Sequence, residues 1–277
     1  MKECPVCNKQ MLFAFPAKLL YKYDVSYYHC TECGLLQTEQ PYWIEEAYKS
    51  AIADQDTGLV ARNIRNRYFL EPILYYLFES NAKFVDIAGG YGLLTRLMRD
   101  IGFDFYHHDE HCSNVFAKYF SPPSSLKADC LTAFEILEHL KNPIEFIKDN
   151  LDKYNCKSLI FSTTIFNGGI PHTDWDYYSF STGQHITFYQ TKTLDYIAQK
   201  LHLFHLHLHS DLHIMTSTPL KKSEKLLLAN SFPRGISNRF VKWKRRSSSK
   251  TLDDHNLVKT INYENIGTDK NIYEAKS

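Results

Sequence analysis

The sequence contains no run of 18 apolar residues, and its first residues lack the charged and then apolar pattern of a secretory signal. These absences argue against a membrane-spanning helix and a cleaved leader, so we expect a cytoplasmic protein that does not enter a membrane. An excess of charge is also missing, because 32 Lys and Arg residues face 31 Asp and Glu residues and leave a formal net charge of +1. A chain so close to neutrality has no overall field that attracts nucleic acid or anionic lipid.

Core-forming residues, by contrast, are plentiful. Hydrophobic residues make up 44% of the 277 positions, and aromatic residues make up 14%. This length and composition allow one large domain and one small domain.

Four of the seven cysteines form two C-x-x-C pairs near the N-terminus, separated by 22 residues. Paired thiolates at this spacing are typical of a tetrahedral Zn²⁺ site, and in a reducing cytosol zinc is favoured over two disulfides. Redox-active or free cysteines are the alternative. The predicted ligands of one structural zinc ion are Cys4, Cys7, Cys30 and Cys33.

Aromatic residues and lysines alternate between the two cysteine pairs. Aromatic side chains favour strands, so we interpret these residues first as the packing face of a small β-ribbon. The alternative is that the rings stack on bases or sugars. The residues concerned are Phe13, Phe15, Lys18, Tyr21, Lys22, Tyr23, Tyr27 and Tyr28.

A glycine-rich turn follows an apolar run within residues 84–92 (Phe-Val-Asp-Ile-Ala-Gly-Gly-Tyr-Gly), and helical periodicity begins at once. This pattern is typical of the first βα turn of a nucleotide-binding α/β domain, where glycines allow close approach of a ligand to the backbone. A second strand pattern ends in Asp109. It is followed by a segment, 127–140, that contains the sequence E-x-x-E-H-L.

This ordered set resembles the class I S-adenosylmethionine-dependent methyltransferases over roughly residues 60–218. Asp86, Gly90 and Gly92 match the family motif D-x-G-x-G-x-G, and Ala88 stands where the first glycine is usual. The resemblance implies an α/β fold with a Rossmann-like seven-stranded sheet, preceded here by the small zinc ribbon. It also implies S-adenosylmethionine as the cofactor.

The resemblance further implies a cofactor site built from the glycine turn and three acids. Asp109 would accept hydrogen bonds from the ribose hydroxyls, and Asp129 would lie near the adenine. Simpler roles remain open, since Asp86 could cap a helix and Asp109 could merely end a strand. The implied cofactor-binding residues are Asp86, Ala88, Gly90, Tyr91, Gly92, Asp109 and Asp129.

Two histidines are candidate bases on the acceptor side, because the pKa of imidazole is near neutrality. We favour His185, which lies in an aromatic segment, 175–188, similar to an insertion of sugar and other small-molecule methyltransferases. His139 beside Glu138 is the competing pair, and a structural role for His185 is the plain alternative. The residues expected to line the acceptor site are Tyr177, Tyr178 and His172.

Three functions follow. The favoured one is methylation of a polar small molecule, such as a sugar or nucleotide-linked sugar of a surface-polysaccharide pathway. The second is RNA methylation, against which the near-zero net charge speaks. The third is a non-catalytic cofactor-binding module. The expected boundaries are a zinc ribbon over 1–40, a helical linker or cap over 41–82, the methyltransferase domain over 83–219 and a polar, partly basic tail over 220–277.

Overall fold

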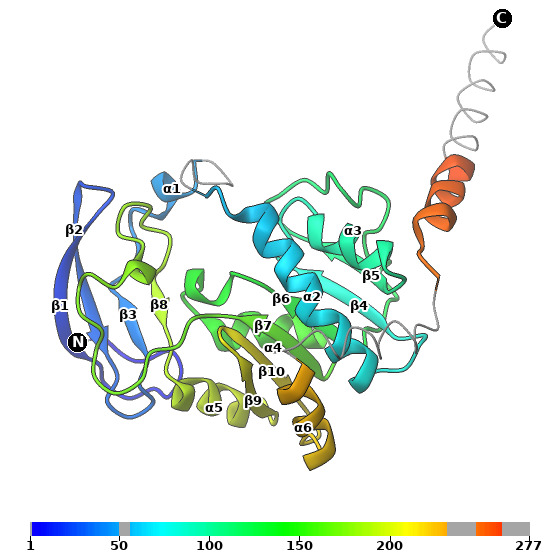
Figure 1. Ribbon diagram of the computed structural model, residues 1–277. Helices are drawn as coiled ribbons and strands as arrows, with labels where there is room; N and C mark the ends of the chain where they lie inside the picture. The colour runs from blue at the N-terminus through cyan, green and yellow to red at the C-terminus, as the bar shows by residue number, and fades with distance from the viewer. Residues whose placement is uncertain (1, 50–55, 232–247, 262–277) are drawn as a thin grey trace, which may run out of the picture.

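Two β-sheets organise the chain, one small and antiparallel and one large and mixed (Figure 1). The computed structural model describes residues 2–49, 56–231 and 248–261. The small sheet has the order β1-β2-β3-β8 and comprises β1 (Leu12–Leu19), β2 (Tyr23–His29), β3 (Leu36–Thr38) and β8 (Thr187–Phe188). The large sheet has the order β5-β4-β6-β7-β10-β9 and comprises β4 (Lys83–Ile87), β5 (Asp104–His108), β6 (Cys130–Ala133), β7 (Ser158–Ser162), β9 (Phe204–His209) and β10 (Leu212–Thr216).

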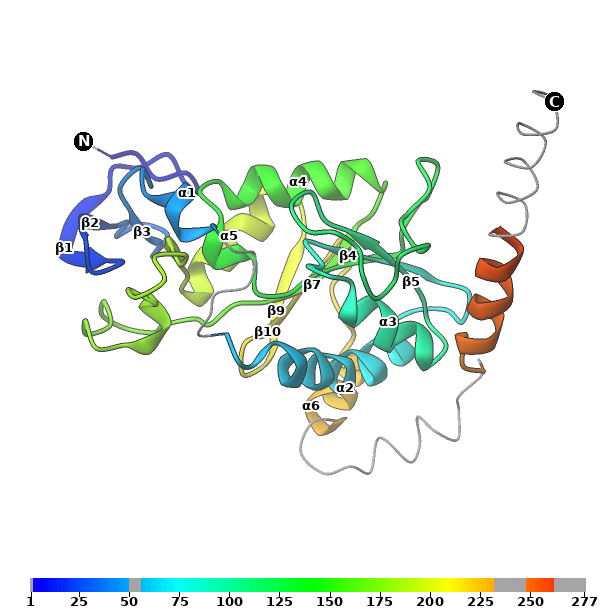
Figure 2. The ribbon, with the colours of Figure 1, turned by 90° about the horizontal axis from the view of Figure 1, so that it is seen from above.

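Helices cover both faces of the large sheet (Figure 2). One face carries α2 (Leu59–Leu77), α3 (Leu93–Asp100) and α6 (Lys222–Ser231), and the other carries α4 (Pro143–Lys153) and α5 (Thr191–Lys200). Alternate residues of β4 serve the two faces, because Phe84 packs in the core under α2 and α3 while Val85 and Ile87 pack in the core under α4 and α5. The predicted α/β class is therefore confirmed.

The large sheet has six strands in the described residues rather than the seven that the resemblance implies. Strands β5, β4, β6 and β7 are parallel, and β10 runs antiparallel to both β7 and β9. Residues 109–129, between β5 and β6, contain no strand. Pro122 and Pro123 lie in this stretch and cannot donate to a sheet ladder, which helps to explain the difference.

The strand order changes direction beside β4. From β4 the chain passes through α3 to β5 on one side, and it then returns to β6 on the other side. Ligands of open α/β sheets bind at such a switch point, outside the carboxyl ends of the strands. The glycine turn after β4 and the 3₁₀ turn η1 (Leu137–His139) after β6 both lie at this edge.

The small sheet is joined to the segment that precedes α5. Strand β3 pairs with β8, with Leu36 opposite Phe188. The ring of Phe15 stacks on Tyr27 with centroids 4.7 Å apart, and Tyr27 is buried. The interpretation of these two aromatics as packing residues is thus confirmed, whereas Phe13 is mostly exposed.

Two further segments are held by buried contacts. Trp43, just before α1 (Ile44–Ala47), is buried in the core of the small sheet and donates a hydrogen bond from Nε1 to the Gly183 carbonyl at 2.8 Å. In the tail, residues 251–261 are helical, and Asp254 accepts hydrogen bonds of 2.6 and 2.8 Å from buried Arg99. Of the basic stretch 242–250, residues 242–247 lie outside the described residues. Within the described part of the chain, every helix is too short or too polar to cross a bilayer.

Candidate active site and metal centre

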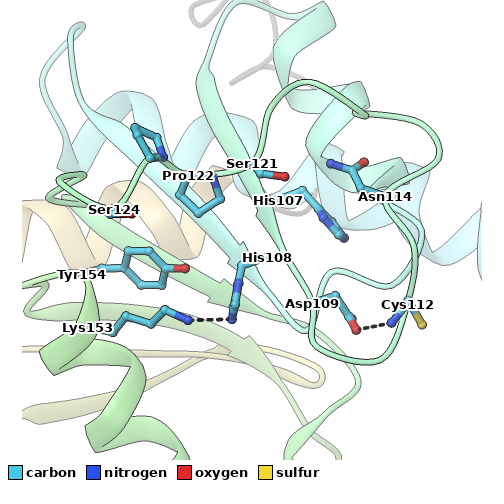
Figure 3. A pocket seen from close by; sticks show the side chains of 11 residues that line it. His107, His108, Asp109, Cys112, Asn114, Ser121, Pro122, Ser124, Lys153 and Tyr154 are labelled. Atoms are coloured by element: carbon cyan, nitrogen blue, oxygen red, sulfur yellow. Dashed lines mark hydrogen bonds between the residues drawn. The ribbon is translucent and has the colours of Figure 1, made fainter.

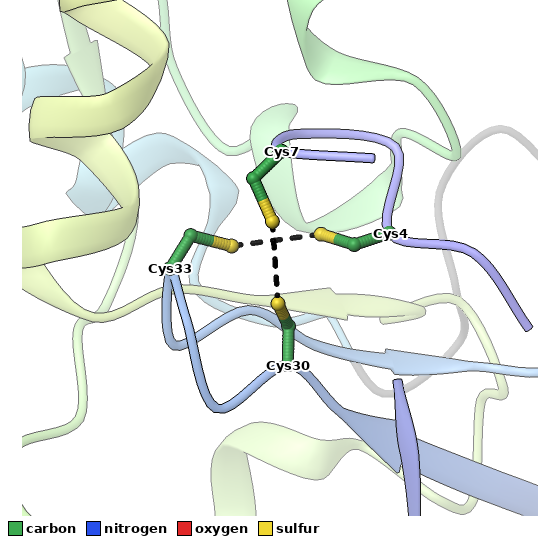
Figure 4. A group of neighbouring side chains, drawn as sticks. All are labelled: Cys4, Cys7, Cys30 and Cys33. Atoms are coloured by element: carbon green, nitrogen blue, oxygen red, sulfur yellow. Dashed lines mark hydrogen bonds between the residues drawn. The ribbon is translucent and has the colours of Figure 1, made fainter. Parts of the chain in front are cut away.

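The four predicted zinc ligands meet at one point (Figure 4). The Sγ atoms of Cys4 and Cys33 are 3.5 Å apart, those of Cys7 and Cys30 are 3.4 Å apart, and all four lie within 4.8 Å of one another. Zn–S bonds of about 2.3 Å in a tetrahedron place sulfur atoms about 3.8 Å apart. The donor set and its spacing therefore fit one Zn²⁺ ion.

The glycine turn combines crowded and open positions. Gly92 has φ +83° and begins α3, and a Cβ atom there would meet Asn114 Oδ1 at 2.6 Å. Gly90 has φ +56°, and a Cβ atom there would meet nothing within 4 Å. The backbone at Gly90 thus borders open space, which allows a ligand to approach it closely. Ala88 occupies the same left-handed region, with φ +55°, without a glycine.

Asp109 connects this turn to the loop that follows β5. Its Oδ2 accepts a hydrogen bond of 2.8 Å from the Gly90 amide, and its Oδ1 accepts from the amides of His111 and Cys112. Asp109 also lines a pocket of about 480 Å³ (Figure 3). The other lining residues include Cys112, Asn114 and Ser121 from the loop after β5, which follows no periodic pattern, and Tyr154 at the end of α4.

Asp86 is buried beneath the turn. Its Oδ1 accepts a hydrogen bond of 2.7 Å from Thr132 Oγ1 on the neighbouring strand β6. Burial raises the pKa of this carboxyl to about 7, and the charge of Asp109 acts in the same direction while the Thr132 hydroxyl opposes it. The prediction that Asp86 ends the first strand at the turn agrees with its position in β4.

A second polar cluster lies after β6. Its members are Glu138, His139 and His185, whose metal-binding atoms all lie within 4.8 Å of one another. The rings of His139 and His185 are in edge contact, with centroids 4.9 Å apart. Glu138 is only 1% exposed, and neither carboxylate oxygen has a hydrogen-bond partner among the described residues. Burial raises the pKa of Glu138, and nearby His185 opposes that rise.

The two histidine rings are oriented by backbone carbonyls. His185 Nδ1 lies 2.6 Å from the Tyr177 carbonyl oxygen, and His139 Nδ1 lies 3.0 Å from that of Gln184. A carbonyl can only accept, so a ring that is hydrogen-bonded to it donates from Nδ1 and, when neutral, keeps its lone pair on Nε2. Tyr48, whose Oη is 2.8 Å from His139 Nδ1, belongs to the same cluster.

Comparisons with known proteins place this site in a family. Residues 60–207 match the family described as methyltransferase domain, which is more than half of the chain. The chain belongs to the methyltransferase domain family. The matched residues contain the glycine turn, Asp109 and all three members of the second cluster.

Several solved structures resemble this methyltransferase at low identity. TnmH has a TM-score of 0.42 and 12% identity, and the match covers 65% of this chain and 62% of TnmH, which is less than two thirds of that protein. Magnesium protoporphyrin IX methyltransferase from Synechocystis PCC 6803 has a TM-score of 0.40 and 12% identity, over 63% of this chain and 94% of that one. The pyocyanin biosynthetic protein PhzM has a TM-score of 0.43 and 13% identity, over 64% and 62%. No curated protein matches the chain in sequence.

The cofactor of this domain is S-adenosylmethionine, and the turn of the methyltransferase fits it. Gly90 borders open space after β4, and Asp109 lines the pocket after β5, so both lie at the carboxyl edge of the sheet, where such a ligand is held. The side chain of Tyr91 is partly buried, and its carbonyl accepts hydrogen bonds from the amides of Val115 and Phe116. Its expected role over the cofactor stays a prediction.

Three predicted site residues lie elsewhere. Asp129 precedes β6 and accepts a hydrogen bond of 2.8 Å from the Lys83 amide, so it lies at the amino edge of the sheet and the prediction that it contacts adenine is wrong. Tyr178 is fully buried in the core of the small sheet, so it does not line an acceptor site. His172 is exposed beside Asp174, whereas Tyr177 contacts His185 with ring centroids 4.7 Å apart.

The raised pKa of Asp86 makes the stability of the methyltransferase depend on pH. The folded chain retains a proton that the unfolded chain releases near pH 4, so this contribution to stability is complete below about pH 4 and is lost as the pH rises to about 7. The slope is at most about 1.4 kcal/mol per pH unit.

We therefore expect Asp86→Asn to remove this part of the pH dependence. Urea unfolding of both proteins, free of cofactor, at several values between about pH 4.5 and about pH 7 measures the difference. If the free energies of unfolding of the wild type and of Asp86→Asn change with pH in parallel across this range, the expectation is contradicted.

A substitution at Gly90 tests the cofactor site. Gly90→Val places a β-branched side chain at φ +56° and fills the open space, so we expect S-adenosylmethionine to bind at least about tenfold more weakly. Gly168→Val is the matched control, because Gly168 also has a left-handed backbone, with φ +76°, and open space around its Cβ position, yet it lies outside the turn. Calorimetric titration gives both affinities, and equal losses in the two variants would mean that strain alone weakens binding.

Proposed function

We propose that the protein transfers the methyl group of S-adenosylmethionine to a hydroxyl of a polar small molecule, a sugar or nucleotide-linked sugar. The observation that carries this proposal is the cluster of Glu138, His139 and His185 beside the cofactor turn, at the carboxyl edge of the same sheet. A hydroxyl must lose its proton when its oxygen attacks a carbon, and this cluster offers groups that promote that loss.

Residues after β4 and β5 would bind the cofactor, and the cluster after β6 would act on the acceptor. When bound, S-adenosylmethionine supplies a methyl group on a positively charged sulfur, and its carbon is therefore electrophilic. The backbone at Gly90 and the carboxylate of Asp109 hold the cofactor. His185, with Nδ1 directed to the Tyr177 carbonyl, presents Nε2 to the acceptor hydroxyl, and His139 with Glu138 forms the competing pair for the same proton.

The acceptor class rests on two further observations. Segment 175–188, which contains His185, is similar to an insertion of sugar and other small-molecule methyltransferases, and it packs against the small sheet through β8. The net charge of +1 offers no general attraction for a polyanion, which favours a small acceptor over RNA.

The experiment has two steps. Calorimetry first measures binding of S-adenosylmethionine and of its demethylated product, and a screen of sugar nucleotides and RNA oligonucleotides then follows methyl addition by mass spectrometry. We expect both cofactor forms to bind and a sugar nucleotide to gain one methyl group. Methylation of RNA but of no sugar nucleotide would overturn the acceptor class, and binding of a nicotinamide cofactor in place of S-adenosylmethionine would overturn the whole proposal.

A further inference from the structure

We propose that Glu138, His139 and His185 form a binding site for a first-row divalent transition-metal ion, distinct from the four-cysteine site. The metal-binding atoms of the three side chains lie within 4.8 Å of one another. Metal bonds of about 2.0–2.2 Å to imidazole nitrogen and carboxylate oxygen place neighbouring ligand atoms about 3–3.5 Å apart. Small side-chain rotations are therefore enough to bring the three groups onto one ion.

The carboxylate of Glu138 has less polar support than its burial requires, because the Tyr177 hydroxyl is close enough to lower its pKa but makes no well-formed hydrogen bond to it. Glu138 is 1% exposed, and both oxygens are without a hydrogen bond among the described residues. An unpaired charge in such a place is unfavourable unless a proton or a cation neutralises it. A cation bound to all three groups would lie between the carboxylate and the two imidazoles.

The guanidinium of Arg62, which lies near Glu138 and Glu135, is already paired with another carboxylate. Arg62 donates to both oxygens of Asp56, at 2.7 and 2.8 Å, and its Nε lies 3.9 Å from Glu135 Oε2. The carboxylate of Asp211, which also raises the pKa of Glu138, pairs with Arg65 at 2.9 Å. The surroundings of Glu138 thus keep an excess of negative charge that favours a bound cation.

Both histidines lie within hydrogen-bond distance of a backbone carbonyl, as metal-binding histidines commonly do. A ligating imidazole commonly donates its other ring N–H to a carbonyl or carboxylate, which fixes the tautomer. The Tyr177 and Gln184 carbonyls do this for His185 and His139, at 2.6 and 3.0 Å. Two nitrogens and one carboxylate form a donor set that suits Mn²⁺, Fe²⁺, Co²⁺, Ni²⁺ or Zn²⁺ better than Mg²⁺ or Ca²⁺.

The role of this ion rests on the proposed function. Three protein ligands leave positions open for acceptor oxygens, and a hydroxyl bound to such an ion is more acidic than a free one. His185 would then promote loss of the proton through the ion rather than by taking it directly. A sugar, with adjacent hydroxyls, offers two oxygens to the open positions.

The test is a calorimetric titration of Co²⁺ into protein that carries one zinc ion per chain, at the four cysteines, after a weak chelator has removed any more loosely held metal, and without cofactor or acceptor. Zinc binds more tightly than cobalt to a given site, so the four cysteines stay occupied. We expect one Co²⁺ ion per chain in addition to the zinc. Glu138→Gln and His185→Ala should each weaken its binding at least about tenfold, since loss of an outer partner alone costs that much. His207→Ala, at an exposed histidine of β9, should not change it.

Thermal unfolding of each variant shows whether it is folded. If Glu138→Gln does not fold, His185→Ala still tests the metal site. Absence of Co²⁺ binding to the wild type that carries one zinc ion per chain, or a Co²⁺ affinity in both variants equal to that of the wild type, would overturn the metal site. Co²⁺ binding without methyl transfer to any acceptor would instead contradict the proposed function and support the site. Full turnover of protein that holds one zinc ion per chain, at the four cysteines, and no other metal would contradict the role of the ion and leave the proposed function intact.

Discussion

Cys33→Ser should remove the zinc ion from the chain and unfold the small sheet. Four thiolates contribute on the order of 10 kcal/mol of binding free energy at neutral pH, and this energy supports folding because the site does not exist in the unfolded chain. The segments that carry the cysteines are mostly turns, and β3 has only three residues. Without the metal, the remaining buried thiols have no ion to bind, and the turns that carry them lose this link.

The unfolding should extend beyond residues 1–40. Strand β8 pairs with β3, and the hydroxyl of Thr193 at the start of α5 donates to the Cys33 carbonyl at 2.8 Å. Hydrogen exchange should therefore show faster exchange of β8 amides as well as of β1 to β3 in Cys33→Ser.

Metal analysis gives the direct measurement. We expect one zinc ion per chain in the wild type, none in Cys33→Ser and one in Cys112→Ser, which is the control because Cys112 lies outside the cluster. Wild-type protein purified without chelator and found to be free of zinc would refute the prediction.

The parts of the fold that local patterns determine were predictable. The turn at Gly90 and Gly92 and the α/β order depend on periodicity and on glycine conformation, which are properties of neighbouring residues. The helical segment expected within residues 41–82 contains α2. The four cysteines were predictable because their spacing alone satisfies a tetrahedral ion.

What the sequence did not reveal depends on contacts between distant segments. The pairing of β3 with β8 joins residues about 150 positions apart, as shown by Leu36 opposite Phe188. Asp129 illustrates a second difficulty, since an acid beside a strand can lie at either edge of the sheet and only the strand register decides which. Tyr177 and Tyr178 are adjacent, yet the 3₁₀ turn η2 (Asp176–Tyr178) sends one to His185 and the other to the core.

The same distant contacts connect the small sheet to the acceptor side. The amide of Ile186 donates to the Glu138 carbonyl at 2.8 Å, and the carbonyl of Ile186 accepts from the Thr38 amide at 3.0 Å. His185 is the residue immediately before this link. The small sheet that carries the four-cysteine site therefore also holds the segment that carries His185.

His185→Ala should lower turnover by about 10²–10⁴ while leaving the affinity for S-adenosylmethionine nearly unchanged. Removal of a group that promotes proton loss has this magnitude, and the effect is confined to turnover because the group acts on the acceptor rather than on the cofactor. The structure supports this separation, since His185 contacts Tyr177 and His139, whereas the cofactor turn is held by Asp109.

Turnover with the best acceptor of the screen and calorimetric affinity for S-adenosylmethionine are the two measurements, with His207→Ala as the control. His139→Ala, measured in parallel, shows whether loss of His139 from the competing pair with Glu138 lowers turnover more than loss of His185. Unchanged turnover in both variants would mean that catalysis here depends on positioning alone. A lowered unfolding midpoint of His185→Ala together with weaker cofactor binding would instead assign His185 a structural role, because a residue that acts only on the acceptor's proton has no reason to alter either quantity.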